Sequence, residues 1–279
     1  MMMSERKSAC TITDKEFNQL ADYIRRNFGI NLREEKRALV TGRLHNVLVQ
    51  NNISNYSDYI ERVLSDKTGK EAAALVSRIS TNYTYFMREA EHFRFFADTV
   101  LPYLKESEKD RDIRIWSAGC SSGEEPYTLA MIMDEYFGSE RNLWDKKVLA
   151  TDISVKVLDK AVQGIYDNGS LATLPAKWRL NNFKQVNGNS STVVDKIRNE
   201  VIFRKFNLVS DTFPFKRKFH VIFCRNVMIY FDSKTKDKLV ERFYDSMEHG
   251  GYLFIGHSES INRESSRFKY VMPAVYRKE

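Results

Sequence analysis

The 279-residue chain carries 44 Lys and Arg against 37 Asp and Glu, a formal net charge of +7, and 42% of its residues are hydrophobic. This is enough apolar material to bury one large core or two smaller ones, which excludes a disordered chain. The three cysteines, Cys10, Cys120 and Cys224, are scattered, and no run of 18 apolar residues occurs, so we expect a cytoplasmic protein without disulfides, a zinc site or membrane insertion.

From Thr13 to about Met87 the sequence shows helical periodicity and almost no strand signal. The first predicted helix begins with a capping-box pair, Thr13 and Glu16, and ends at Gly29. Its apolar face consists of Phe17, Leu20, Tyr23, Ile24 and Phe28. Further helices are predicted over 34–50, 55–64 and 70–80, the first of them with Leu39, Leu44, Val47 and Leu48 pointing inward. We therefore expect an N-terminal all-α domain, residues 1–88.

Basic residues are frequent in the first half of this domain. They are Arg25, Arg26, Arg33, Lys36, Arg37 and Arg43. Such a pattern fits a surface that binds an acidic protein, and it fits an ordinary solvated helix face equally well. The net positive charge by itself also allows a nucleic-acid partner.

From Ile113 onward, strand-like runs alternate with helical ones. The runs are "IRIWSAG", "KVLATDI", "HVIFCRNV", "GGYLFIGHS" and "YVMPAVYR", and the alternation predicts a parallel, doubly wound α/β domain, residues 89–279. Between Ala161 and Asn207 the pattern changes to short apolar runs with turn signals at 168–169 and 187–188. We expect a small strand-rich insertion there, residues 164–204.

The stretch "RIWSAGCSSGEEPYTLA" reads as a strand, a glycine loop and a helix start, with Pro126 in the first helical turn. Such a loop lets a nucleotide-like ligand approach the backbone at a helix N-terminus. Glu124 and Glu125 would repel a pyrophosphate and suit a ligand with a positive charge. Compensation of the helix dipole explains the same two acids, and the segment alone leaves both interpretations open.

The second strand of this domain ends in an acidic residue, Asp152, about thirty positions after the glycine loop. A carboxylate in this place can hold the hydroxyls of a ribose, or it can simply cap the next helix. Neither G-x-G-x-x-G nor G-x-x-x-x-G-K-[ST] occurs. The combination therefore favours an adenosine-containing cofactor that is neither a dinucleotide nor a nucleoside triphosphate.

Six segments together resemble the CheR family of chemotaxis methyltransferases over nearly the whole chain. They are "STNYTYFMRE", "WSAGCSSGEEPYTLA", "ATDIS", "FNLVS", "FCRNVMIYFD" and "GGYLFIGHSES". The resemblance implies a Rossmann-like α/β methyltransferase domain with an N-terminal all-α domain and a small antiparallel β-subdomain. It implies a monomeric, S-adenosylmethionine-dependent protein-glutamate O-methyltransferase that releases S-adenosylhomocysteine. The implied substrate is the cytoplasmic helical region of chemoreceptors, and the product is a glutamyl methyl ester. The basic character of the N-terminal helices suits contact with such a glutamate-rich region, as well as an ordinary solvated face.

The resemblance also implies site residues. The cofactor pocket falls on Asn82, Thr84, Arg88, Glu125, Asp152, Asn207, Leu208, Arg225 and Asn226. Arg88 and Tyr230 are implied near the transferred methyl group, where they orient the substrate carboxylate, and no metal is implied. Without the resemblance, Asn207 is interpreted as a turn residue, and Leu208 and Tyr230 as core side chains.

The implied chemistry accounts for residues that are missing. A glutamate carboxylate is already ionised near neutral pH, so methyl transfer to it needs no general base and no Ser-His-Asp arrangement. His257 and Cys224 are interpreted as structural. A nucleic-acid methyltransferase would be expected to show an Asn-Pro-Pro-Tyr-like motif or a Pro-Cys pair, whereas Phe223 precedes Cys224. A binding module that has lost activity is the other alternative, and the intact motifs argue against it.

Overall fold

The computed structural model describes residues 11–279, and Cys10 lies outside this range. Contacts divide the chain into a helical unit that ends at Thr81 and an α/β unit from Asn82 to Glu279. We had expected the division between residues 88 and 89. Residues 82–88 belong with the α/β unit because the Ser121 hydroxyl donates a hydrogen bond to the Asn82 carbonyl and the Phe86 ring packs against other rings of that unit.

The helices of the helical unit follow the start and stop signals in the sequence. They are α1 (Asp14–Phe28), the 3-10 segment η1 (Glu34–Lys36), α2 (Arg37–Gln50), α3 (Tyr56–Ser65) and α4 (Lys70–Ile79). The predicted capping box of Thr13 and Glu16 is present, and Gly29 ends α1 at a φ of 70°. Leu39 was predicted to point inward but is 49% exposed. The buried stripe of α2 runs one position further along, through Val40 and Leu44.

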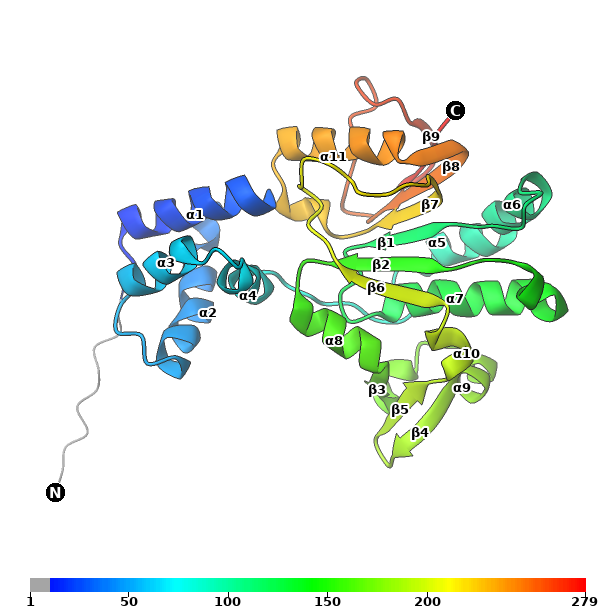
Figure 1. Cartoon of the computed structure of the whole chain (residues 1–279), viewed down its shortest axis with the longest axis horizontal. Helices are drawn as coiled ribbons and strands as arrows, with labels where there is room; N and C mark the ends of the chain where they lie inside the picture. The colour runs from blue at the N-terminus through cyan, green and yellow to red at the C-terminus, as the bar shows by residue number, and fades with distance from the viewer. Residues whose placement is uncertain (1–10) are drawn as a thin grey trace. The chain divides into compact units, whose positions relative to one another are not determined.

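A seven-stranded sheet forms the centre of the α/β unit, in the order β6-β2-β1-β7-β8-β10-β9 (Figure 1). The strands are β1 (Ile115–Ala118), β2 (Val148–Asp152), β6 (Val201–Lys205), β7 (Phe219–Cys224), β8 (Met247–Ile255), β9 (Lys269–Met272) and β10 (Val275–Arg277). β6, β2, β1, β7 and β8 are parallel to one another. β10 is antiparallel to both β8 and β9, so the sheet is mixed rather than all-parallel.

The last predicted strand, "YVMPAVYR", therefore forms two strands and a turn. Pro273 and Ala274 make the turn, and Ala274 has a φ of 62°. Proline cannot donate to a sheet ladder, which explains why the strand stops there and the chain reverses.

Helices cover both faces of the sheet. They are α5 (Ala90–Phe95), the π-helical segment η2 (Phe96–Val100), α6 (Leu101–Ser107), α7 (Glu124–Phe137), α8 (Val155–Gln163) and α11 (Ser233–Asp245), with the 3-10 segments η3 (Gly138–Leu143) and η5 (Met228–Tyr230). Alternate residues of β1 enter different cores: Ile115 packs with α5 to α7, and Trp116 packs with α11. None of the helices in residues 11–279 is long and apolar enough to cross a membrane.

The predicted insertion is a separate three-stranded antiparallel sheet in the order β3-β5-β4 (Figure 1). It contains β3 (Ile165–Asp167), η4 (Asn168–Leu171), α9 (Ala176–Asn182), β4 (Phe183–Asn187), β5 (Ser190–Val193) and α10 (Asp195–Arg198). Our range of 164–204 is too long at its C-terminal end. Val201 to Lys205 form β6, which pairs with β2 in the large sheet.

Candidate functional site

The parallel strands place most of the sequence-predicted site residues at one edge of the sheet. Asp152 ends β2, and Arg225 follows β7 directly. Asn207 and Leu208 come shortly after β6, whose neighbour Phe206 donates its N–H to the Asp152 carbonyl over 3.0 Å. Because these strands are parallel, their carboxyl ends meet at the same edge. This is where doubly wound sheets bind ligands.

Two glycines of the loop after β1 are required by close packing within the protein. Gly119 has a φ of 85°, and a Cβ there would lie 2.4 Å from Val227 Cγ2. Gly123 has a φ of 97°, and its Cβ would lie 2.9 Å from both Ala161 Cβ and the Tyr166 hydroxyl. The space that these glycines leave is thus filled by protein atoms. Gly119 allows the loop after β7 to pack closely against this turn, and Gly123 does the same for the last turn of α8 and for Tyr166 of β3.

The two adjacent acids of the loop lie in different environments. Glu124 is 7% exposed and accepts hydrogen bonds on both carboxylate oxygens from the Ser122 hydroxyl, at 3.0 and 2.8 Å. Burial raises its pKa. Glu125 instead accepts from the Ser117 hydroxyl at 2.7 Å and from Arg225 Nε at 2.8 Å. Only Glu125 is therefore connected to the residues that follow β7.

Arg225 is a buried anchor with a partner for each of its three nitrogens. Besides its bond to Glu125, its Nη2 donates to the Arg88 carbonyl at 2.8 Å, and its Nη1 lies 3.2 Å from His92 Nδ1. The guanidinium carbon lies 4.9 Å from the centroid of the Phe93 ring. Such a side chain acts on a ligand mainly by fixing its neighbours, because a planar guanidinium holds its partners in set directions.

Asp152 is 9% exposed and is held by backbone groups. Its Oδ2 accepts from the Ser121 N–H and its Oδ1 from the Ser154 N–H, both at 2.9 Å. Burial raises its pKa, against the opposing effect of these hydrogen bonds. A carboxylate offers about four acceptor positions, so these backbone bonds leave acceptor capacity on Asp152. Asn82 lies nearby, because its carbonyl accepts from the Ser121 hydroxyl.

Arg88 lies in a strained segment. Its neighbours Met87 and Glu89 have φ values of 60° and 55°, a region that residues other than glycine rarely adopt. Its Nη1 donates to the Tyr83 carbonyl at 2.7 Å. Observed strain of this kind is typical of functional segments. Thr84, which precedes this turn, is half-buried.

Three further predicted residues, Leu208, Asn207 and Tyr230, follow β6 and β7. Leu208 is 8% exposed and packs into the core that contains Trp116. Asn207 Oδ1 accepts from the Val209 N–H at 3.2 Å, as a turn residue would. Tyr230 ends η5 and is half-exposed. Asn207 thus lies in a turn and Leu208 packs in the core, as the residue types alone suggested.

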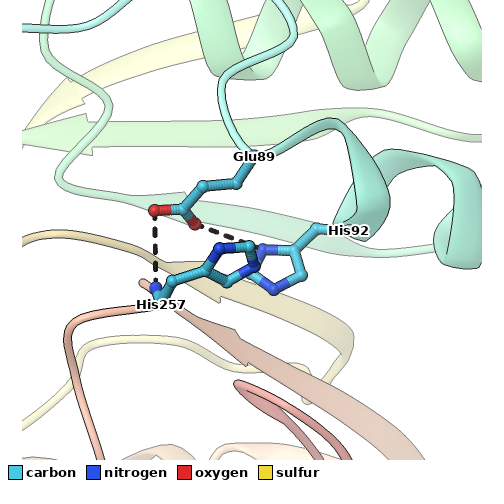
Figure 2. Close-up of side chains that lie close together, drawn as sticks. All are labelled: Glu89, His92 and His257. Atoms are coloured by element: carbon cyan, nitrogen blue, oxygen red, sulfur yellow. Dashed lines mark hydrogen bonds and ion pairs between the residues drawn. The ribbon is translucent and has the colours of Figure 1, made fainter.

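Sequence reasoning missed Glu89, which connects three segments of the site. Its Oε1 accepts from Asn226 Nδ2 at 3.1 Å, and its Oε2 lies 3.6 Å from Arg225 Nη1. Its Oε1 also lies 3.4 Å from the His257 backbone nitrogen (Figure 2). Burial opposes its ionisation, but Arg225 and these hydrogen bonds outweigh burial and lower its pKa. The feature of the sequence that could have identified Glu89 is its position directly after Arg88.

Glu89, His92 and His257 bring three metal-type donor atoms within 4.8 Å of one another (Figure 2). The Arg225 guanidinium lies 3.2 Å from His92 Nδ1 and pairs with Glu89. A divalent cation among these donors would therefore lie beside a fixed positive charge. Charge repulsion favours a hydrogen-bonded network here rather than a metal centre.

The buried His92 makes stability pH-dependent. Burial, reinforced by the positive charge of Arg225, lowers the pKa of His92 from 6.5 to about 4. Between these values the unfolded chain binds a proton that the folded protein does not, so the free energy of unfolding should fall as the pH is lowered from 6.5 to about 4. Urea denaturation measures the free energy of unfolding across this pH range. The free energy should fall less steeply in His92→Gln than in the wild type, and as steeply as in the wild type in exposed His249→Gln. Equal slopes in all three proteins would contradict this assignment.

Comparison with known protein families identifies both units of the chain. Residues 82–276 match the family model described as "CheR methyltransferase, SAM binding domain", and residues 15–80 match "CheR methyltransferase, all-alpha domain". Fold and site thus define an S-adenosylmethionine-dependent methyltransferase, with S-adenosylmethionine as its cofactor. The chain belongs to the CheR methyltransferase family.

Curated relatives extend over nearly the whole chain. The chain is 43% identical to the "Chemotaxis protein methyltransferase" of Borreliella burgdorferi, over 96% of this chain and 95% of that protein. It is 33% identical to the protein of the same name from Escherichia coli, over 99% and 94%. A "Probable chemotaxis protein methyltransferase" of Rhizobium etli is 37% identical over 85% and 89%. The expected fold class and cofactor are confirmed, and the protein is a methyltransferase of chemotaxis.

Proposed function

We propose that the protein transfers the methyl group of S-adenosylmethionine to glutamate side chains in the cytoplasmic helical region of chemoreceptors. The products are glutamyl methyl esters and S-adenosylhomocysteine, and the enzyme acts as a cytoplasmic monomer. Identity of 43% and 33% to chemotaxis protein methyltransferases over almost their full length carries this proposal. The local chemistry supports it, since the residues suit a substrate that needs orientation rather than activation.

The proposed cofactor pocket lies at the edge of the sheet where the parallel strands end. Asp152 accepts the ribose hydroxyls, and Asn207 and Leu208 meet the adenine through a polar and an apolar group. Glu125, held by Arg225, faces the positively charged end of the methionine part. Asn82, Thr84, Arg88 and Asn226 complete the pocket. Bound S-adenosylmethionine supplies a methyl group on a sulfonium, and the chain supplies position and exclusion of water.

Arg88 and Tyr230 orient the acceptor. The guanidinium of Arg88 grips the substrate carboxylate through its fork of donors, and the Tyr230 hydroxyl adds one directional hydrogen bond. The carboxylate is ionised and acts as the nucleophile without a general base. Neutralising it too strongly would slow the transfer, so two donors rather than a dense cationic pocket suit the reaction.

Mass spectrometry tests the proposal. The protein is incubated with S-adenosylmethionine and receptor cytoplasmic fragments, and the methylated residues are mapped. We expect methyl groups on glutamate side chains only. Methyl groups on lysine or arginine, or transfer to RNA or DNA and not to receptor fragments, would contradict the proposed substrate.

The helical unit is proposed to contact the receptor through fewer basic residues than the sequence suggested. Arg43 donates to the carbonyls at the end of α4, with Nη1 2.6 Å from the Ile79 oxygen. Arg37 pairs with Asp14 and Glu34. These two arginines stabilise the unit itself. Three of the others are exposed, namely Arg25, Arg26 and Arg33.

Replacing Arg25 and Arg26 together by Gln should raise the KM for receptor about five- to tenfold and leave S-adenosylmethionine affinity unchanged, because two attractive charges are lost. Steady-state kinetics at low ionic strength and isothermal titration measure the two effects. The matched control replaces the exposed Lys67 and Lys70 by Gln. An equal rise in KM for both double variants would show that only the net charge of the protein matters. It would contradict a receptor contact on α1.

A further inference from the structure

Glu259 is a buried carboxylate that is not among the sequence-predicted site residues. It is 8% exposed and lies shortly after β8, at the same edge of the sheet as Arg225 and Asp152. Within the described part of the chain it forms no ion pair, and its partners are backbone N–H groups. A buried charge without a counter-ion is costly unless hydrogen bonds satisfy it, so its retention calls for a reason.

The partners of Glu259 come from two loops. Its Oε2 accepts from the Gly256 N–H at 2.6 Å and from the Asn226 N–H at 2.9 Å, and its Oε1 accepts from the Ile229 N–H at 3.1 Å. Gly256 belongs to the turn after β8, whereas Asn226 and Ile229 belong to the segment after β7. One carboxylate therefore joins the ends of two adjacent strands.

The segment after β7, residues 225–230, has little regular structure of its own to fix it. It contains only the three-residue η5, and Asn226 adopts a φ of 61°. Asn226 is held from two sides: Glu259 accepts its backbone N–H, and Glu89 accepts its side-chain Nδ2. Tyr230 follows directly on Ile229, whose N–H Glu259 also fixes.

Gly256 gives independent support for a close fit at this point. A Cβ on Gly256 would lie 2.8 Å from the Asn226 nitrogen and 2.9 Å from Glu259 Oε2. The turn after β8 thus approaches the segment after β7 so closely that no side chain fits between them. The two loops are matched in shape as well as joined by hydrogen bonds.

We propose that Glu259 is a positioning residue, which places Asn226 against the cofactor and Tyr230 against the substrate carboxylate by holding the backbone of residues 225–230. This inference rests on the proposed function, from which the roles of Asn226 and Tyr230 come. Glu259 touches neither cofactor nor substrate. It acts through the loop, and its contribution is to rate rather than only to folding.

The test variant is Glu259→Gln, with exposed Glu264→Gln of the same loop as its control. Glutamine keeps one acceptor oxygen but turns an NH₂ group toward a backbone N–H. For the folded fraction, well below the Tm, we expect kcat for receptor methylation to fall about tenfold or more in Glu259→Gln and to stay near wild type in the control. Hydrogen exchange of the Asn226 and Ile229 amides should become faster in Glu259→Gln alone.

Gly256→Ala tests the same contact without removing any hydrogen-bonding group. It should lower kcat in the same way, and Gly169→Ala, whose Cβ would meet nothing within 4 Å, should not. An unchanged kcat in folded Glu259→Gln, or a lower Tm with wild-type kinetics, would overturn the proposal. If wild type methylates no receptor fragment, the proposed function fails, and the exchange rates of the two amides still decide whether Glu259 holds the loop.

Discussion

Glu125→Gln is expected to weaken S-adenosylmethionine binding about 30-fold, close to 2 kcal/mol, the contribution of a hydrogen bond to a charged group. The substitution keeps the length of the side chain and one acceptor for Arg225 Nε, now 2.8 Å from the carboxylate. It removes the negative charge proposed to face the positively charged end of the methionine part. Isothermal titration measures the loss directly.

Glu124→Gln is the matched control for this experiment. Glu124 precedes Glu125 in the chain, but its carboxylate is bound to the Ser122 hydroxyl rather than to Arg225. We expect it to change the affinity less than about twofold. Equal losses in the two variants would mean that the acids act only as a general negative potential at the start of α7.

Arg225→Met is expected to cost about 3–5 kcal/mol of the free energy of unfolding, because removal of one partner leaves a buried charge uncompensated. Glu125 and Glu89 both lose their cation, and the Arg88 carbonyl loses its donor. Methionine preserves much of the apolar contact with the Phe93 ring. Urea denaturation of the unliganded protein gives the cost.

The surface residue Arg267 supplies the comparison. It pairs with Glu241 and Asp245 but is 52% exposed, so Arg267→Met should cost less than about 1 kcal/mol. If Arg225→Met destabilises the protein no more than Arg267→Met does, the buried network is not what holds the segment around Arg88. Adding Glu125→Gln to Arg225→Met should recover part of the loss, since it removes one of the stranded charges.

Much of the fold could be predicted because its signals are local. The Thr13 and Glu16 capping box, Gly29 and the strand-loop-helix stretch around Pro126 all depend on neighbouring residues. The strands at the ends of the sheet and the boundary of the insertion could not be predicted in this way, because they depend on pairing between strands that are distant in the sequence. β6 belongs to the large sheet only because its partner is β2. No local pattern distinguishes that pairing from one more strand of the insertion.

For a similar reason, some residues of the site could be predicted from the sequence and others could not. Motif matching located the residues that follow β1, β2 and β7, but it could not show which of their atoms bind protein. The structure assigns the space at Gly119 to Val227 and the Arg225 donors to Glu125 and its neighbours. Glu89 and Glu259 were missed because both bind Asn226, which lies 137 and 33 residues away from them in the chain.

The proposed reaction gives a carboxyl ester as its product. The most direct measurement incubates the protein with methyl-radiolabelled S-adenosylmethionine and receptor cytoplasmic fragments, and then treats the labelled receptor with mild base. We predict that the label is released as methanol, because an ester hydrolyses where N-methyl and ether products do not. Label that stays on the receptor after this treatment would contradict glutamyl ester formation.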